Sequence, residues 1–439
     1  MKRICQLLGM TVVLSLGLQS CSSSDDDVDL GEAKQVINML SEPIPINLTT
    51  EQRTFAYDNK QFALNFLNTV NETDRSGKSF IYSPLSITYV LGMVNDAATG
   101  LTEKELEETL GFHEGGIQAV NDYCKKLIDG LPKVDDKVTL NIANAIFLNK
   151  SFTLKPQFTQ DMQTYYDAKA EALDFKASET LGHINDWCSE KTNGMIPTIL
   201  DEIDPLIMSY LLNAIYFKAD WASKFDPQNT KDETFTTENS NSNTQMPMMH
   251  QNVLISYLKS DTYSAVILPY GTGLWNMTIV LPEEGKTVDD VIKELTESSV
   301  LNNRGWCDAG GNTFQAYEVD LKLPRFETNS DTDNIDDGLI GLMKKMGIKR
   351  AFDDALAEIP NMCELPVYIE MMRQKAKIKV NEEGSEAAAV TVAGMKNFSM
   401  GSEPKEYPKA TFHANRPFVY VIHEQSSGVI LFVGKFTGA

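Results

Sequence analysis

After Leu140 the sequence changes from helical periodicity to short apolar runs that favour β-strands. NIANAIFLN, SAVILPYG, NMTIVLPEEG and EVDLKLPRF are four of these runs, and turn-forming residues separate them. The last run, PFVYVIHEQSSGVILFVGKF, predicts two strands joined by a Ser-Ser-Gly turn. No low-complexity break or internal repeat divides the chain after residue 51. The pattern predicts a single α+β domain with helices concentrated early and large antiparallel sheets later.

Helical patterns precede the β-prone part. In residues 51–70 the apolar side chains fall on one face, which predicts an amphipathic helix. Ser83 is the predicted cap of a second helix, with Pro84 at its first position. Thr102 is the predicted cap of a third helix, where Glu105 three residues later predicts a capping box.

The N-terminus has the pattern of an export signal. Lys2 and Arg3 precede an apolar run, residues 7–18, that is too short to span a bilayer as a stable helix. The residues that end at Cys21 resemble the lipobox of bacterial lipoproteins, with ordinary secretory cleavage near Ser20 as the alternative. We expect residues 1–20 to be a signal peptide and residues 21–50 to be a lipidated cysteine followed by a flexible, acidic and serine-rich tether.

Charge and cysteine usage exclude several classes of protein. The net charge of −22 argues against nucleic acid and heparin-like polyanions as partners. Beyond the signal and Cys21, four cysteines remain, and none forms a CxxC pair: Cys124, Cys188, Cys307 and Cys363. They could form two disulfides, but free buried thiols are favoured, and neither a metal site nor a cofactor is predicted.

A search for catalytic motifs fails. The chain has five histidines, with neither a GxSxG elbow nor an HExxH motif. Ser76–Ser79 reads SGKS, but Glu72 stands where a P-loop needs its first glycine. His423 beside Glu424 could in principle serve a hydrolase, although a lone histidine in a strand pair is far more often a surface or packed residue.

Residues 382–394, EEGSEAAAVTVAG, follow a strand-like run, residues 375–380, in which lysines alternate with apolar residues. That run suits a sheet edge with room for a neighbour. Beyond Gly384, strand alternation places Ser385, Ala387, Ala389 and Thr391 on one small, uncharged face. Glu386, Ala388, Val390 and Val392 fall on the other face. A short helix capped by Ser385 is the alternative.

Several stretches, in the order in which they occur, together resemble the serpins. The resemblance covers residues 51–439 and rests on YSPLSI (82–87), INDWCSEKTNGMI (184–196), NAIYFKADWASKF (213–225), MPMMHQ (246–251), LPYG (268–271), IVLPEEG (279–285), NEEGSEAAAVT (381–391) and ANRPFVYVI (414–422).

The resemblance implies a serpin fold of three β-sheets, eight or nine helices and an exposed reactive-centre loop at about residues 382–412. It also implies a decoy substrate rather than an enzyme. A target protease would attack the loop and form an acyl-enzyme, and the cut loop would then insert into the main sheet. The catalytic nucleophile would belong to the target, a serine or cysteine protease held in a covalent complex.

Serpin motifs assign roles to individual residues. The hinge of the loop would be Glu382, Glu383, Gly384, Ser385, Glu386, Ala387, Ala388, Ala389, Val390 and Thr391. The shutter, where the strands part, would comprise Ser83, Ser86, Asn213 and Gln374, with glutamine at a position that is often histidine. The breach, at the top of the sheet, would comprise Trp221, Arg325 and Glu382, with an ion pair between the last two.

The serpin resemblance also implies a position for the reactive bond. The usual count in serpins, seventeen residues from Glu382 through the residue before the bond, ends at Phe398 and implies cleavage between Phe398 and Ser399 by a chymotrypsin-like protease. The long loop leaves other bonds open, at Met395, Lys396, Asn397 and Met400. Lys396 would suit trypsin-like proteases, and Met395 or Met400 elastase-like ones. A binding-only serpin and, more remotely, a secreted hydrolase are the alternatives to an inhibitor. We expect a monomer tethered by its lipid to the outer membrane, at the cell surface or on the periplasmic face.

Overall fold

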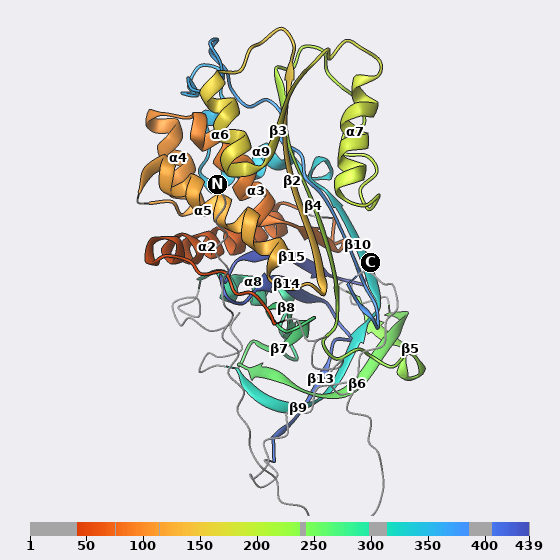
Figure 1. The fold of residues 1–439 in the computed structure, drawn as a ribbon. Helices are drawn as coiled ribbons and strands as arrows, with labels where there is room; N and C mark the ends of the chain where they lie inside the picture. Colours follow the sequence, from red (N-terminus) through yellow and green to blue (C-terminus); the bar gives the residue numbers. More distant parts are fainter. Residues whose placement is uncertain are drawn as a thin grey trace, which may run out of the picture. The chain divides into compact units, whose positions relative to one another are not determined.

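The computed structural model describes residues 42–438 apart from Arg75, Glu114 and residues 238–242, 298–313 and 386–405. Helices and strands in this part form an α+β domain (Figure 1). Eight α-helices are described: α2 (Thr50–Thr73), α3 (Pro84–Ala97), α4 (Gly100–Leu110), α5 (Gly116–Gly130), α6 (Pro156–Tyr166), α7 (Thr180–Lys191), α8 (Val288–Glu297) and α9 (Gly338–Met346). Short 3-10 turns are η1 (Leu131–Lys133), η2 (Pro227–Asn229), η3 (Thr332–Asn334) and η4 (Arg350–Phe352).

Two of the helix starts show how far local sequence decides the fold. Ser83 caps α3 by accepting a hydrogen bond from the Ser86 amide, with Pro84 in the first turn, as predicted. The capping box predicted at Thr102 and Glu105 is wrong, because α4 begins at Gly100. Thr102 instead accepts a hydrogen bond from the Glu358 amide, and Glu105 accepts from two backbone amides near η4. Tertiary contacts therefore use both side chains that could have capped the helix.

A six-stranded sheet has the strand order β10-β11-β12-β4-β2-β3. Its strands are β2 (Val138–Asn149), β3 (Ala168–Leu173), β4 (Ser209–Asp220), β10 (Phe326–Asp331), β11 (Lys375–Val380) and β12 (Gly384–Ser385). Helix α7 covers one face, and α3 lies on the other (Figure 1). The α7 side has its own core, in which Ile184 and Trp187 pack with Phe147, Tyr210 and Leu212.

A nine-stranded sheet has the order β1-β15-β14-β8-β7-β6-β9-β13, and β5 also pairs with β6. Its strands are β1 (Phe80–Tyr82), β5 (Lys231–Thr236), β6 (Asn243–Lys259), β7 (Tyr263–Tyr270), β8 (Trp275–Pro282), β9 (Gln315–Pro324), β13 (Lys409–His413), β14 (Phe418–Glu424) and β15 (Ile430–Phe436). Strand β6 pairs with β5 over residues 243–248, with β9 over residues 248–257 and with β7 over residues 256–259. Two of the three expected sheets are thereby joined into one hydrogen-bonded sheet.

The main core lies where the two sheets and the helices meet. Every residue of α3 is buried, and this helix contacts β4, β15 and four other helices. Residues 42–49 precede the predicted domain start at residue 51, yet Ile46 and Leu48 are buried in this core. None of the described helices is both long and apolar enough to cross a membrane. Cys124, Cys188 and Cys363 are buried free thiols, as favoured; Cys307 lies outside the described residues.

A buried acid in α3 gives a first prediction. Burial raises the pKa of Asp96 to about 6, against a smaller opposing effect of the hydrogen bond from Asn121 (2.6 Å). The folded state therefore holds this proton more tightly than the unfolded chain, and stability falls as the pH rises from about 4 through about 6. Asp96→Asn should be more stable than the wild type at pH 7 by roughly 2 kcal/mol. Urea denaturation at several pH values measures this, and the difference should vanish below pH 4; a constant difference would contradict the prediction.

Candidate functional site

The hinge begins inside the six-stranded sheet. Gly384 and Ser385 form β12, which pairs with Asp220 and Ala219 of β4 on one side. On its other side Ser385 pairs with Val380 of β11. Strand β11 is the run predicted at residues 375–380, and its apolar residues are buried as the alternation indicated. The strand that fills the predicted free edge of β11 is thus β12, the start of the predicted hinge.

Ser385 is held in this position by a buried side chain. It is 2% exposed, and its hydroxyl lies 2.6 Å from that of Tyr270 at the end of β7. The Tyr270 ring stacks on Trp221, with ring centroids 4.3 Å apart. Burial raises the pKa of Tyr270, so its hydroxyl stays protonated. Position 385 therefore favours a small side chain with a hydroxyl, and sequence reasoning had not identified Tyr270 as its partner.

Gly384 is the residue that allows this approach. Its φ is +155°, and a Cβ atom there would lie 2.0 Å from the Ala219 carbonyl oxygen and 2.6 Å from the Asp220 Cα. Both are backbone atoms of β4, so they cannot move aside as a flexible side chain would. Any larger residue would push the hinge out of the sheet.

The two acids before Gly384 are paired. Arg325 Nε donates to both Glu382 carboxylate oxygens at 2.7 Å, so the predicted ion pair is present. Burial opposes ionisation of Glu382, but the hydrogen bonds from Arg325 and Thr230 outweigh it and lower its pKa. Lys224 pairs with Glu383 and with Asp220 of β4. These contacts hold the start of the hinge to the top of the sheet.

Trp221 closes the same region. Its indole Nε1 donates to the Asn381 carbonyl at 2.9 Å, and its backbone amide donates to the Glu383 carbonyl at 2.8 Å. The structure thus brings together all three residues predicted for the breach. Thr230, Lys224 and Asn381 also belong to the cluster. The family motifs contain Lys224 and Asn381 but gave them no role, and Thr230 reaches Glu382 only across 152 positions of sequence.

The strands on either side of β12, β4 and β11, come together again beyond the end of β12, and their residues are in matching register there. Leu211 of β4 and Met372, just before β11, form an isolated parallel bridge. Ala219 is eight positions beyond Leu211 in the sequence, and Val380 is eight positions beyond Met372. A strand extending β12 antiparallel to both would therefore bring Thr391 level with Asn213 and Gln374. Among the described residues, no ladder joins β4 to β11 directly between these two points.

The residues predicted for the shutter lie at that level, but only three of them are connected. The Gln374 amide accepts from the Ser83 backbone N–H at 2.8 Å and donates to the Ser83 carbonyl at 2.9 Å. Ser86 joins this group through the α3 cap. Asn213 instead donates to Asn144 at 2.7 Å, and its buried Oδ1 has no hydrogen-bond partner. Ser86, Asn213 and Gln374 line a small cavity between the strands.

The remaining predicted residues cannot be placed. The hinge from Glu386 to Thr391, the reactive-bond candidates Met395, Lys396, Asn397, Phe398, Ser399 and Met400, and Cys21 lie outside the described residues. On the far side of the loop, β13 pairs in parallel with β9 from Lys409 to His413. The loop is therefore held in a sheet at both of its described ends.

His423 is a packed residue, as favoured, and not part of a hydrolase centre. It is fully buried between β8 and β15, and burial lowers its pKa to about 3, so the ring is neutral. Its Nε2 lies 3.0 Å from the Thr278 hydroxyl. The Glu424 carboxylate accepts hydrogen bonds from Ser426 and Ser427, which stabilises the β14–β15 turn.

The contact between Tyr270 and Ser385 gives a second prediction. Tyr270→Phe keeps the stacking on Trp221 but leaves the Ser385 hydroxyl without its buried partner, which should lower stability by about 1 kcal/mol. Amide hydrogen exchange at Gly384 and Ser385 should accelerate as β12 opens. Tyr263→Phe, in the same strand but distant from β12, is the matched control. Equal protection of Ser385 in all three proteins would contradict this role for Tyr270.

Comparisons with known proteins agree with this geometry. A family model described as "Serpin (serine protease inhibitor)" matches residues 57–438. Serpin B6 of Macaca fascicularis is 30% identical, with alignment over 86% of this chain and 98% of the relative. Leukocyte elastase inhibitor A of Rattus norvegicus is also 30% identical, over 86% and 97%. The structure of human thyroxine-binding globulin with its ligand is 27% identical, with a TM-score of 0.72 over 87% of this chain and 98% of that one.

Proposed function

Because this chain belongs to the serpin family, we propose that it inhibits extracellular serine proteases by acting as a suicide substrate. The observation that carries the proposal is β12, in which the hinge already forms hydrogen bonds between β11 and β4. A loop cut beyond the hinge can extend this strand without first finding its register. The small face that begins at Ser385 would then enter the sheet.

The chemistry belongs to the target. Its nucleophilic oxygen or sulfur attacks the carbonyl carbon before the cut bond, the C–N bond breaks, and the leaving nitrogen takes up a proton. The acyl-enzyme links the target to the hinge side of the loop. Insertion must then outrun hydrolysis of the acyl bond. About a dozen new ladder hydrogen bonds at ~1 kcal/mol each would favour insertion by on the order of 10 kcal/mol.

The cut we propose is between Phe398 and Ser399, which suits a chymotrypsin-like protease. Met395 and Met400 would suit elastase-like proteases, and Lys396 a trypsin-like one. The name of the rat relative, an elastase inhibitor, supports a target in the elastase-like class. A loop with several usable bonds could trap more than one class of serine protease, and cysteine proteases that cut there.

Incubation with chymotrypsin, elastase and trypsin, followed by SDS gel electrophoresis, tests the proposal. A band that resists SDS at the summed mass of protease and inhibitor is the expected result. Mass spectrometry of the released C-terminal peptide would identify the cut bond. The likeness to thyroxine-binding globulin favours a binding-only protein as the second candidate. In that case the loop would be cleaved with no covalent complex for any protease.

We also propose that the protein is a lipoprotein anchored through Cys21 to the bacterial outer membrane and exposed at the cell surface. The basic residues, apolar run and Cys21 of the N-terminus support this, and the acidic stretch behind Cys21 would serve as a tether. Cys21→Ala should abolish labelling by a radioactive fatty acid and release the protein from membranes. If protease added to intact cells does not cleave this protein, the protein lies on the periplasmic face of the outer membrane instead of at the cell surface.

A further inference from the structure

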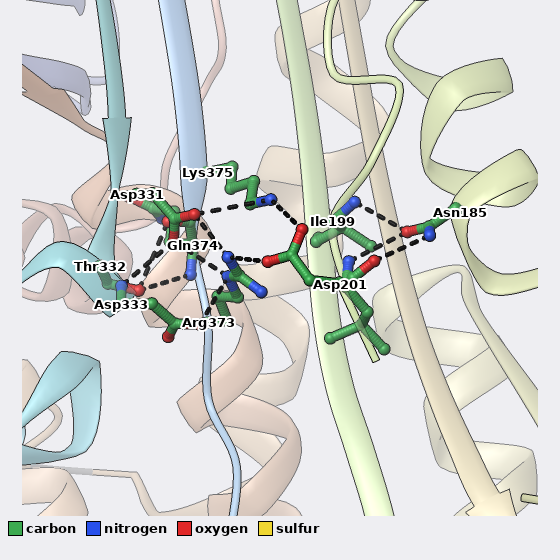
Figure 2. Close-up of polar contacts among 10 residues, drawn as sticks. Asn185, Ile199, Asp201, Asp331, Thr332, Asp333, Arg373, Gln374 and Lys375 are labelled. Atoms are coloured by element: carbon green, nitrogen blue, oxygen red, sulfur yellow. Dashed lines mark hydrogen bonds and ion pairs between the residues drawn. The ribbon is translucent and has the colours of Figure 1, made fainter. Parts of the chain in front are cut away.

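Arg373 lies just before β11 and is bound by three aspartates (Figure 2). Its guanidinium makes two hydrogen bonds to Asp331, of 2.9 and 2.6 Å, at the end of β10. Its Nε also lies 2.9 Å from Asp333 Oδ2, on η3. One terminal nitrogen donates to Asp201 Oδ2 at 2.7 Å. The Arg373 side chain is only 6% exposed, whereas that of Asp201 is 65% exposed.

Asp201 lies in the segment between α7 and β4, on the other side of the line between β4 and β11 from Arg373. It follows Ile199 and Leu200, whose backbone amides both donate to Asn185 Oδ1 of α7, at 2.8 and 3.0 Å (Figure 2). Ile199 and Leu200 are buried in the core that joins α7 to β2 and β4. Asp201 is therefore fixed to the half that contains α7 and β4, while Asp331 and Asp333 are fixed to the half that contains β10 and β11.

The ion pair between Arg373 and Asp201 consequently crosses the line along which β12 would be extended. Neighbouring strands lie about 4.8 Å apart, so a strand inserted at this level would move β4 and β11 apart by roughly that distance. A hydrogen bond of 2.7 Å cannot survive such a displacement. Lys375 reaches Asp201 as well, at 3.7 Å, and would lose that weaker contact.

Breaking this contact would not leave Arg373 unpaired. Asp331 and Asp333 move with Arg373 because all three belong to the β10–β11 half, and Asp201 becomes hydrated at the surface. The hydrogen bond from Arg373 lowers the pKa of Asp201, so the carboxylate is ionised at neutral pH. The Arg373–Asp201 ion pair thus stabilises the closed sheet. In the opened sheet neither charge is left buried without a partner, so losing the ion pair adds little to the free energy of that state.

We infer that the Arg373–Asp201 ion pair is a latch across the six-stranded sheet that slows insertion of a new strand beyond the level of Thr391. This inference rests on the proposed insertion mechanism. By register, residues 386–391 can extend β12 as far as Asn213 and Gln374 before the next residue, Val392, reaches the level of Arg373. The latch would allow residues 386–391 to insert and would slow insertion of Val392 and the residues that follow it.

The test uses a synthetic peptide with the sequence of residues 385–398 and the intact protein. The rate of peptide insertion is followed as the appearance of a species with a raised unfolding temperature. Asp201→Ala should insert the peptide about three to ten times faster than the wild type, since one charge-assisted hydrogen bond is removed. Glu202→Ala removes the same charge from the adjacent exposed position and should leave the rate unchanged. In 1 M NaCl the wild type should accelerate toward the rate of Asp201→Ala.

The outcomes separate the latch from the mechanism on which it rests. Equal rates in the wild type, Asp201→Ala and Glu202→Ala, with insertion observed in all three, would overturn the latch alone. Equal acceleration in both variants would assign the effect to net charge and would also overturn it. Failure of every protein to insert the peptide would overturn both the latch and the insertion mechanism. Cooperative unfolding before peptide addition, with Asp201→Ala only slightly below the wild type and Glu202→Ala equal to it, verifies that the substitutions leave the fold intact, because loss of the ion pair alone lowers the stability of the closed sheet a little.

Discussion

Replacing Ser385 by arginine is expected to convert the proposed inhibitor into a substrate that a protease cleaves and releases. Ser385 is buried between β11 and β4, against Tyr270. An arginine there would bury an unpaired charge at a cost of several kcal/mol and has no room between the strands. That cost is a large part of the ~10 kcal/mol proposed for insertion. SDS gels should show cleaved protein in place of the covalent complex.

Two further variants make this prediction sharper. Ala387→Pro leaves Ser385 and its hydroxyl contact in place but removes a ladder hydrogen bond two residues later, so it should also favour cleavage over trapping. Glu386→Arg is the control: it changes the charge at the position between Ser385 and Ala387, on the face expected to stay in solvent. This variant should still form SDS-resistant complexes. Unchanged SDS-resistant complexes with Ser385→Arg or Ala387→Pro would refute the assigned hinge.

Replacing Arg325 by methionine should destabilise the top of the six-stranded sheet by about 2 kcal/mol. The Glu382 side chain is 7% exposed and would lose its charged partner, although Arg325 itself is 45% exposed and solvent weakens the pair. We expect a melting temperature lower by several degrees and faster loss of inhibitory activity on storage. Thermal unfolding and residual inhibition after incubation at 37 °C measure the two effects.

A double-mutant cycle tests whether the pair is responsible. Glu382→Gln in the Arg325→Met background removes the uncompensated buried charge and should restore part of the stability. The wild-type pair contributes stability above pH about 4.5, and this contribution is lost as the pH falls through the lowered pKa of Glu382. Purely additive effects of the two substitutions at pH 7 would contradict the coupling.

Much of the fold could be predicted because local signals agree with it. Ser83 and Pro84 start α3 as expected, and the alternation in residues 375–380 gives β11 with its correct buried face. The error at Thr102 and Glu105 arose because distant backbone amides compete for those side chains. The continuity of β6, which joins two expected sheets, depends on partners far apart in the sequence, and no short pattern encodes it.

The candidate site divides in the same way. The family motifs led to Arg325, Glu382 and Trp221, and the structure brings these together. The LPYG motif contains Tyr270 but gave no role to its hydroxyl, which meets Ser385 across 115 positions of sequence. The family motifs did not lead to Arg373, because its significance comes from three aspartates on separate segments. A long-range side-chain contact leaves no local pattern in a single sequence.

The two-residue strand β12 also bears on the kinetics of trapping. Starting a new strand is slow because several residues must be ordered before the first hydrogen bonds form, whereas lengthening an existing strand adds one residue at a time. With Gly384 paired to β4, and Ser385 paired to both β4 and β11, the nucleus of the new strand would exist before any protease arrives. Only propagation would remain to compete with hydrolysis of the acyl bond. A protein in which Gly384→Ala erased this nucleus should therefore lose trapping efficiency even though its reactive bond is unchanged.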